Sequence, residues 1–186
     1  MTTSDPTVVM VRARIQAPHL YEPFTNKFGK TQYSVILRLY DEKEFAKVEA
    51  AKLAACERKF GAANAEKKLR VINKNPNCCL LREPDEEEGY RFMTVTRKPD
   101  DGMPTLLDRT RKNVSQADGL FVSGAWVNAL IQTWAYDNQS TGVGATIVGL
   151  QFVKADEPFG GAPKAKAEDF EDLGDDGEEG DNPLFA

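Results

Sequence analysis

The sequence predicts a mainly β domain, a small antiparallel barrel or a sandwich with one substantial helix, followed by an acidic tail. Three observations predict it. Several short segments alternate apolar and polar residues with a period of two, as strands do. A single long stretch has clear helical spacing, so strands and helices do not alternate as they would in a doubly wound sheet. Residues 155–186 are rich in Gly, Pro, Ala, Asp and Glu, a composition that cannot bury a core.

The first two strands are expected over residues 8–15 and 31–40. Both segments contain β-branched residues, and both place apolar side chains on one face and arginines on the other. The segment between them contains two prolines and a glycine, residues that interrupt regular structure. We therefore expect a loop from residue 16 to residue 30.

The helix is expected from Asp41 to Phe60. Asp41 is a favourable N-cap, and Glu44 three residues later predicts a capping box. Apolar residues follow at helical spacing, and Gly61 predicts the end of the helix. Residues 62–77 predict another short helix followed by a turn.

The remaining strands are expected in the second half of the chain. An acidic loop, Asp85–Glu88, separates the first two of them. The last two are the clearest, and a turn at Asn138–Gly142 joins them. The earlier of this pair is expected to bend near Gly124. The expected strands are Cys78–Leu81, Tyr90–Arg97, Thr105–Leu107, Phe121–Tyr136 and Gly144–Val153.

The net charge of −5 averages two different parts of the chain. Residues 155–186 carry 11 acidic and 2 basic side chains, a net charge of −9. Residues 1–154 carry 18 acidic and 22 basic side chains, a net charge of +4. A mildly basic body with a strongly acidic end is expected of a polyanion binder with an interaction tail.

Cysteine and histidine usage weakens several classes of site. Cys56, Cys78 and Cys79 lack C-x-x-C spacing, and His19 is the only histidine. We therefore expect reduced thiols, no metal and no cofactor, and a protein that is not an enzyme. No run of 18 apolar residues is present, and residues 1–7 lack the features of a signal peptide, so we expect a cytoplasmic protein.

The most informative segment runs from residue 125 to residue 136. Its odd positions are mostly small and apolar, which suits a barrel interior. Its even positions interleave three aromatic rings with two amides, which suits a surface that stacks bases at about 1–3 kcal/mol per base. Packing of these rings beneath the helix or a loop stays open as the alternative. The candidate binding residues here are Trp126, Asn128, Gln132, Trp134 and Tyr136.

Basic residues add to this candidate surface. Several lie on strand faces opposite the apolar ones, two flank a phenylalanine in a loop, and residues 67–82 contain five basic and no acidic side chains. Arginines beside exposed rings can bind phosphates and also stack on bases. The candidates for binding a nucleic-acid strand are Arg12, Arg14, Lys27, Phe28, Lys30, Arg38, Lys74, Arg91 and Arg97.

The tail ends with two apolar side chains after its acidic run. Acidic residues alone would explain a solubilising tail, but they do not explain Leu184 and Phe185. Apolar anchors after acids predict a flexible peptide that docks into a basic-rimmed pocket of a partner. The candidate partner-binding residues are Asp175, Asp176, Glu178, Glu179, Asp181, Leu184 and Phe185.

Four segments resemble a known group of proteins: residues 119–127, 134–137, 142–154 and the ending Asn182–Phe185. They resemble the bacteriophage single-stranded DNA-binding proteins, which combine an OB fold with an acidic tail ending in an aromatic residue. The resemblance implies an OB-fold-like antiparallel β-barrel over residues 1–154 and a disordered acidic tail over residues 155–186. Ala186 departs from the pattern, because it displaces the terminal carboxylate from the ring of Phe185.

The resemblance also implies a function. The protein would bind single-stranded DNA without sequence specificity in phage DNA replication and recombination. It would coat the strand by phosphate contacts and base stacking, and its tail would recruit replication proteins such as DNA polymerase or helicase/primase. Proteins of this group commonly dimerise, so a homodimer is expected.

Two other functions stay open. A structural or scaffold protein of the virion would also combine a β domain with a charged tail, and the aromatic strand would then be an assembly interface. A metal-dependent nuclease would need carboxylates that converge from separate strands, whereas the acids of residues 85–88 are consecutive on a loop.

Overall fold

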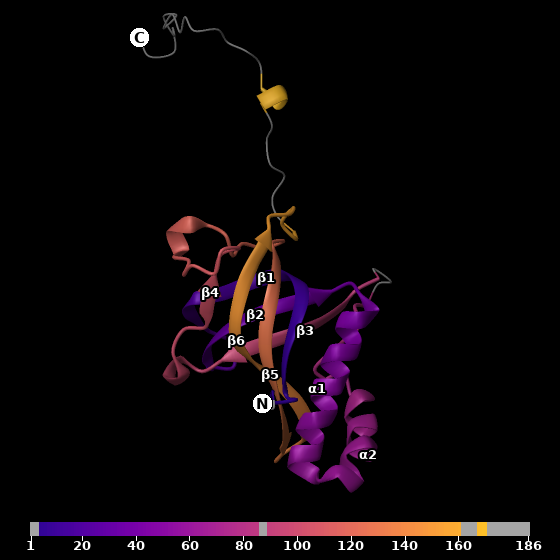
Figure 1. Cartoon of the computed structure of the whole chain (residues 1–186). Helices are drawn as coiled ribbons and strands as arrows, with labels where there is room; N and C mark the ends of the chain where they lie inside the picture. The colour runs from indigo at the N-terminus through magenta and orange to yellow at the C-terminus, as the bar shows by residue number, and fades with distance from the viewer. Residues whose placement is uncertain (1–3, 86–88, 161–166, 171–186) are drawn as a thin grey trace, which may run out of the picture.

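Five strands close into a barrel in the computed structural model, which describes residues 4–85, 89–160 and 167–170 (Figure 1). The hydrogen-bonded order is β3-β2-β1-β5-β6, and all these neighbours are antiparallel. A parallel pairing of Thr96 in β3 with Thr146 in β6 closes the ring. The strands are β1 (Val8–Thr25), β2 (Thr31–Leu39), β3 (Arg91–Arg97), β5 (Trp126–Asp137) and β6 (Thr141–Lys154). This is the arrangement of an OB fold, so the expected fold class is confirmed.

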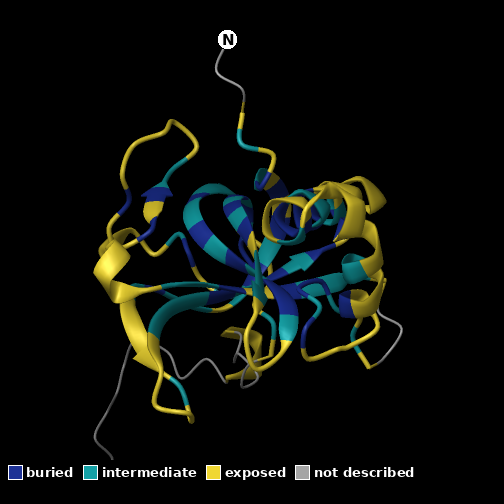
Figure 2. Ribbon diagram, turned by 90° about the horizontal axis from the view of Figure 1, so that it is seen from below, coloured by how far each residue is buried: buried dark blue, intermediate teal, exposed yellow. Residues whose placement is uncertain are grey.

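Alternate residues of the strands fill the barrel, as the period of two predicted. The inward side chains are essentially inaccessible to solvent, and most are β-branched or small, which lets opposing strands pack closely. Figure 2 shows buried residues along the barrel strands and exposed ones on the outer loops and helix faces. The completely buried members include Val11, Ala13, Ile15, Leu37, Leu39, Val127, Ala129 and Ile131.

β1 is longer than expected, and the prediction of a loop after Ile15 was wrong. The strand continues to Thr25, although its register with β2 shifts twice, between Gln16 and His19 and again before Phe24. Ala17 has a φ of 47° in this irregular stretch. Such bulges bend a strand, which lets the first half of β1 pair with β5 and the second half with β2. Pro18, which lacks an N–H, is tolerated where the ladder is already interrupted.

The helix after β2 begins as expected, but its capping box does not form. α1 spans Glu42–Phe60, and Asp41 accepts a hydrogen bond from the backbone N–H of Lys43. The Glu44 carboxylate accepts instead from the backbone N–H of Arg12 in β1, at 2.8 Å. This contact ties the start of α1 to the barrel. α1 ends at Gly61, whose φ of 81° favours glycine.

A second helix, α2 (Ala62–Asn73), packs antiparallel to α1 and confirms the short helix that was expected there. The buried ammonium of Lys52 joins the two helices by donating to Glu49 and Asn73. The hydroxyl of Thr133 in β5 donates to the carbonyl of Ala51 at 2.8 Å, which fixes α1 against the barrel. None of the helices in the described ranges is long and apolar enough to cross a membrane.

Three other expectations concern single segments. Residues 78–81 form no strand, and the chain pairs with β3 only at an isolated bridge between Arg82 and Phe92. β5 begins at Trp126 rather than Phe121, because the chain turns at Gly124, where φ is 93°. The short strand β4 (Thr105–Leu107) is confirmed and pairs in parallel with β6.

Part of the expected tail lies outside the described residues. All the partner-binding candidates lie in that part of the tail: Asp175, Asp176, Glu178, Glu179, Asp181, Leu184 and Phe185.

Candidate nucleic-acid interface

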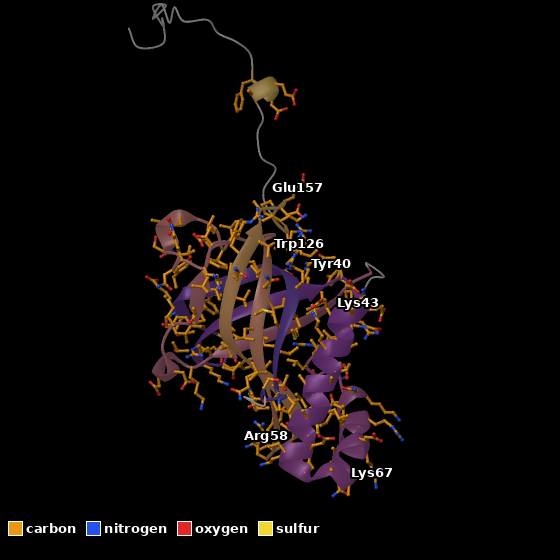
Figure 3. The ribbon with its side chains drawn as sticks, in the orientation of Figure 1. Tyr40, Lys43, Arg58, Lys67, Trp126 and Glu157 are labelled. Carbon is orange, nitrogen blue, oxygen red and sulfur yellow. The ribbon has the colours of Figure 1, made fainter. Side chains whose placement is uncertain are left out.

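Four aromatic rings follow one another on the outside of the barrel. Tyr40 lies directly after β2, Tyr90 directly before β3, Phe92 in β3 and Trp126 at the start of β5. The Tyr40 ring centroid is 5.6 Å from that of Trp126 and 5.7 Å from that of Tyr90, and Tyr90 is 6.5 Å from Phe92. Figure 3 shows Tyr40 and Trp126 together near the end of the barrel from which the tail leaves.

Two arginines lie among these rings. Arg14 of β1 and Arg38 of β2 are direct partners in the β1–β2 ladder. The Arg14 guanidinium is 5.8 Å from the Trp126 ring, and the Arg38 guanidinium is 4.5 Å from the Tyr90 ring. We call Arg14, Arg38, Tyr40, Tyr90, Phe92 and Trp126 the aromatic–arginine cluster. Rings for bases beside cations for phosphates are the combination by which OB folds bind single strands.

The first residues of the tail, 155–160, lie on Arg14, Arg38 and Trp126 of this cluster, and we call them the proximal tail. The Trp126 indole N–H donates to the Asp156 carboxylate at 2.8 Å, and Arg14 lies 3.6 Å from the same carboxylate. Arg14 also donates to the backbone carbonyl of Glu157 at 2.7 Å. The hydrogen bonds from Trp126 and from the Glu157 N–H, with the charge of Arg14, lower the pKa of Asp156. The carboxylate is therefore held ionised on the cluster.

Phe159 completes the contact of the proximal tail with the cluster. Its ring centroid is 4.2 Å from the Arg14 guanidinium and 3.9 Å from the Arg38 guanidinium. Gly124 lies beneath this segment, and a Cβ there would collide with the Glu157 carbonyl. The proximal tail thus places the Asp156 carboxylate on Arg14 and Trp126, and the Phe159 ring on Arg14 and Arg38. These are the groups suited to bind a phosphate and a base.

The other two aromatic candidates of β5 lie apart from the cluster. Trp134 is about 26 Å further along the strand than Trp126, at about 3.3 Å per residue. Its side chain is 46% exposed, and its ring centroid lies 5.5 Å from that of Tyr136. A Cβ on Gly142 or Gly144 of β6 would collide with these two rings, which therefore lie across the glycines. Gln132 lies on the same face of β5. Trp134 is not covered by the helices.

Arg12 and Asn128 occupy the next outward positions of their strands after Arg14 and Trp126. The Arg12 Nε–H donates to the Asn128 amide oxygen at 2.7 Å. In the loop between β1 and β2, Phe28 is 83% exposed and the ammonium of Lys27 lies 5.1 Å from its ring. Lys30 follows in the same loop, which is one of those used by OB folds to bind oligonucleotides.

The three remaining candidates have other surroundings. Arg97 donates to three backbone carbonyls, those of Asp101, Gly102 and Ile147. Arg91 lies 4.7 Å from the Phe45 ring and 3.2 Å from Glu83. Lys74 is the residue after α2. Arg91 and Arg97 therefore have contacts that hold the fold together.

The cluster contains residues that sequence reasoning did not select. Tyr40, Tyr90 and Phe92 of the cluster were missed, and so were Phe159 of the proximal tail and the neighbouring Lys154, whose ammonium lies 5.5 Å from the Trp126 ring. A signal was present for three of them. Tyr40 follows Arg38 by two residues and Phe92 follows Tyr90 by two, so each pair shares an outward strand face.

Comparison with known proteins identifies the family. The family model described as the single-stranded DNA-binding protein of Enterobacter phage Enc34 matches residues 6–182. The chain belongs to this family. A protein named p50 from Acyrthosiphon pisum secondary endosymbiont phage 1 is 30% identical over 166 residues, which cover 86% of this chain and 90% of that protein. The resemblance carried by the sequence segments is therefore confirmed.

Solved structures share the fold of this Enc34-family protein. The phage Enc34 single-stranded DNA-binding protein in complex with single-stranded DNA has a TM-score of 0.60 at 19% identity, covering 83% of this chain and 90% of that one. The single-stranded DNA-binding protein gp2.5 of bacteriophage T7 has a TM-score of 0.54 at 13% identity, covering 90% and 96%. At these identities the likeness establishes the OB-type fold.

Proposed function

We propose that this Enc34-family protein coats single-stranded DNA without sequence specificity during phage DNA replication and recombination, in the cytoplasm of the host. The observation that carries this proposal is the aromatic–arginine cluster. Bases would stack on Trp126, Tyr40 and Tyr90, and phosphates would bind Arg14 and Arg38. Because every base has a π-face, stacking of this kind tolerates any sequence.

The proximal tail supports a second part of the proposal, which is that the tail competes with DNA. Asp156 and Phe159 contact Arg14, Arg38 and Trp126, so a bound strand has to displace them. Displacement would free the acidic tail to recruit DNA polymerase or helicase/primase through Leu184 and Phe185. The family resemblance also implies a homodimer, which sedimentation velocity over a range of protein concentrations tests.

Titration with oligo-dT, followed by tryptophan fluorescence, tests the binding site. If about 3–5 phosphates are neutralised, log affinity against log salt has a slope of about −2 to −3.5. Replacing both Arg14 and Arg38 with Ala is expected to weaken binding to all sequences alike and to make this slope shallower. The matched control replaces Lys59 and Lys67, exposed cations of the helices, with Ala.

Three results would contradict the proposal. A salt-independent affinity would exclude phosphate binding, and the absence of any quenching would favour the virion scaffold protein. Hydrolysis of the oligonucleotide in the presence of magnesium or manganese would favour the nuclease.

A further inference from the structure

A basic loop lies between β4 and the chain that leads to β5. Residues 108–113 form this loop, and the bridge between Leu107 and Asn113 closes it. The Asp108 carboxylate accepts from the backbone N–H groups of Thr110 and Lys112, at 2.7 and 2.9 Å, and from the Thr110 hydroxyl at 2.8 Å. These hydrogen bonds lower the pKa of Asp108. The only acid of the loop is therefore engaged in holding its backbone.

The loop carries three cations, Arg109, Arg111 and Lys112, and all are exposed. Within the described part of the chain, none of the three forms an ion pair. Arg111 has a φ of 67°, a conformation that the hydrogen-bonded turn imposes. The loop is thus a preformed group of positive charges that no other part of the described fold neutralises.

A row of hydrogen-bonded polar side chains connects this loop to the aromatic–arginine cluster. Arg12 of β1 donates to Asn128 of β5, and Asn128 donates to Gln151 of β6 at 3.2 Å. Gln151 in turn donates to the backbone carbonyl of Asp108 at 3.4 Å. The row begins beside Arg14 and crosses three strand spacings, about 14 Å in all. The side chains of the row carry no negative charge, and the Glu44 carboxylate at its Arg12 end accepts from the Arg12 backbone N–H.

We propose that the basic loop is a second phosphate-binding element for the same DNA strand. A strand that leaves the aromatic–arginine cluster crosses β5 and β6 along this polar row, and Arg109, Arg111 and Lys112 bind its phosphates. The inference rests on the proposed function and extends it to longer DNA. The acidic tail is negatively charged, as DNA is. The continuous row of polar side chains favours the DNA strand bound at the cluster, rather than the tail, as the ligand of the basic loop.

The test compares oligo-dT of about 6 and about 20 nucleotides, because one OB fold binds about 4–16 nucleotides. The variant combines Arg109→Gln, Arg111→Asn and Lys112→Gln, since asparagine tolerates the positive φ at position 111. Its affinity for the long oligonucleotide is expected to fall about ten- to hundredfold near 0.1 M salt, with a salt slope shallower by about 2. Its affinity for the short oligonucleotide should not change.

A matched control removes the same charge from the helices, through Lys59→Gln, Lys67→Gln and Arg70→Gln, and should change neither affinity. Asp108→Ala keeps all three cations but releases the loop, so it should also weaken binding of the long oligonucleotide. Asp108→Asn retains the acceptor oxygen and should restore wild-type binding. These two variants distinguish the effect of the positions of the cations on DNA affinity from the effect of their number.

Unchanged affinity and slope of the loop variant for the long oligonucleotide would overturn the inference. The proposed function would survive that result if Arg14 and Arg38 were still needed for the short oligonucleotide, and it would fail if the wild type bound neither. The loss should persist after deletion of residues 168–186. If deletion removed the difference between variant and wild type, the loop would bind the acidic tail, and the inference would be wrong.

Discussion

Trp126 and Trp134 lie on the same face of β5 in different surroundings. Trp126 is half-buried between Tyr40, Arg14 and the Asp156 carboxylate, whereas Trp134 contacts Tyr136 and is 46% exposed. A ring that stacks a base needs an open face, and neighbouring cations add contacts to the phosphates of the same strand. Displacement of the proximal tail would free the indole N–H edge of Trp126 and uncover both guanidinium groups beside it.

The first prediction follows from this contrast. Trp126→Ala is expected to weaken binding of a short oligo-dT by about 1–3 kcal/mol, because one stacked base is lost. Trp134→Ala should leave that affinity unchanged and the melting temperature nearly so, since its ring fills no core. Fluorescence anisotropy of a labelled oligonucleotide measures the affinity in both variants. Equal losses in the two variants would place both rings on the DNA.

The second prediction concerns Phe159. Phe159→Ala is expected to tighten oligo-dT binding by about 0.5–2 kcal/mol, because DNA no longer has to displace a ring from two guanidinium groups. The matched control is Phe170→Ala, which removes a ring that is 69% exposed in the same tail. Anisotropy titrations at low salt compare the two. Weaker binding by the Phe159 variant would mean that this ring belongs to the DNA-binding surface.

At the scale of elements, local patterns predicted the strand faces well. Val11, Ala13 and Ile15 alternate with outward arginines, and burial follows that alternation. The second half of β1 was missed because Pro18 indicates a loop locally, whereas barrel closure requires a strand long enough to pair on both sides. The capping box failed because Glu44 found a tertiary partner, and no local pattern contains that information.

Only part of the candidate site was expected from the sequence, because local patterns do not contain tertiary contacts. Trp126 was selected because aromatic rings interleaved with amides are unusual on an outer strand face, and Arg14 and Arg38 because they belong to a pattern of basic residues opposite the apolar strand faces. Tyr40 and Tyr90 stand at strand ends, and only closure of the barrel brings them together. The contact of Phe159 with the arginines joins the tail to the first two strands, so it could not be read from spacing along the chain.

A third prediction concerns the junction of the N-terminal segment with α1. Asp5 lies 2.7 Å from Arg58 of α1 (labelled in Figure 3). The hydrogen bonds from Arg58 and Thr7 lower the pKa of Asp5 well below its usual value of 3.8. A lowered pKa in the folded state adds stability above about pH 4, and this contribution is lost as the pH falls toward the folded-state pKa.

Asp5→Asn should therefore reduce the melting temperature slightly at pH 7 and not at the acid end of a pH series. The effect should be small because the pair is exposed to solvent. Thermal melts of wild type and variant between about pH 2 and pH 7 measure it. A difference that is constant across the series would show that the charge of Asp5 plays no part.

At the scale of the whole molecule, the charge division sets how body and tail interact. A tail of net charge −9 is tethered to a body of net charge +4, so its acids have a high effective concentration near the cluster. The fourth prediction is that deleting residues 168–186 tightens DNA binding, most visibly at low salt, where screening is weakest. Titrations at two salt concentrations measure the effect. Weaker binding after deletion would mean that the tail supports the fold or the dimer.

The tail tip is expected to act separately from the tail charge. Replacing Leu184 and Phe185 with Ala keeps the charge and removes the apolar anchor. Contact with replication proteins should be lost while DNA affinity stays near wild type. Co-sedimentation with the phage polymerase or helicase/primase measures the first quantity. Retained contact would assign recruitment to the acids alone.

The closure of the barrel has a mechanical consequence. Four of its five junctions are antiparallel ladders, but β3 and β6 share a single paired position, Thr96 with Thr146. Arg97 reinforces that seam by donating across it to the carbonyl of Ile147 at 3.0 Å. Local breathing of the barrel should therefore start there, and Arg97→Ala should speed amide hydrogen exchange at residues 146–148 well before it affects the β1–β5 ladder. Single-stranded DNA bound over β2 and β3 would therefore contact the part of the barrel next to its weakest junction. That junction, between β3 and β6, is held by one paired position and the Arg97 hydrogen bond.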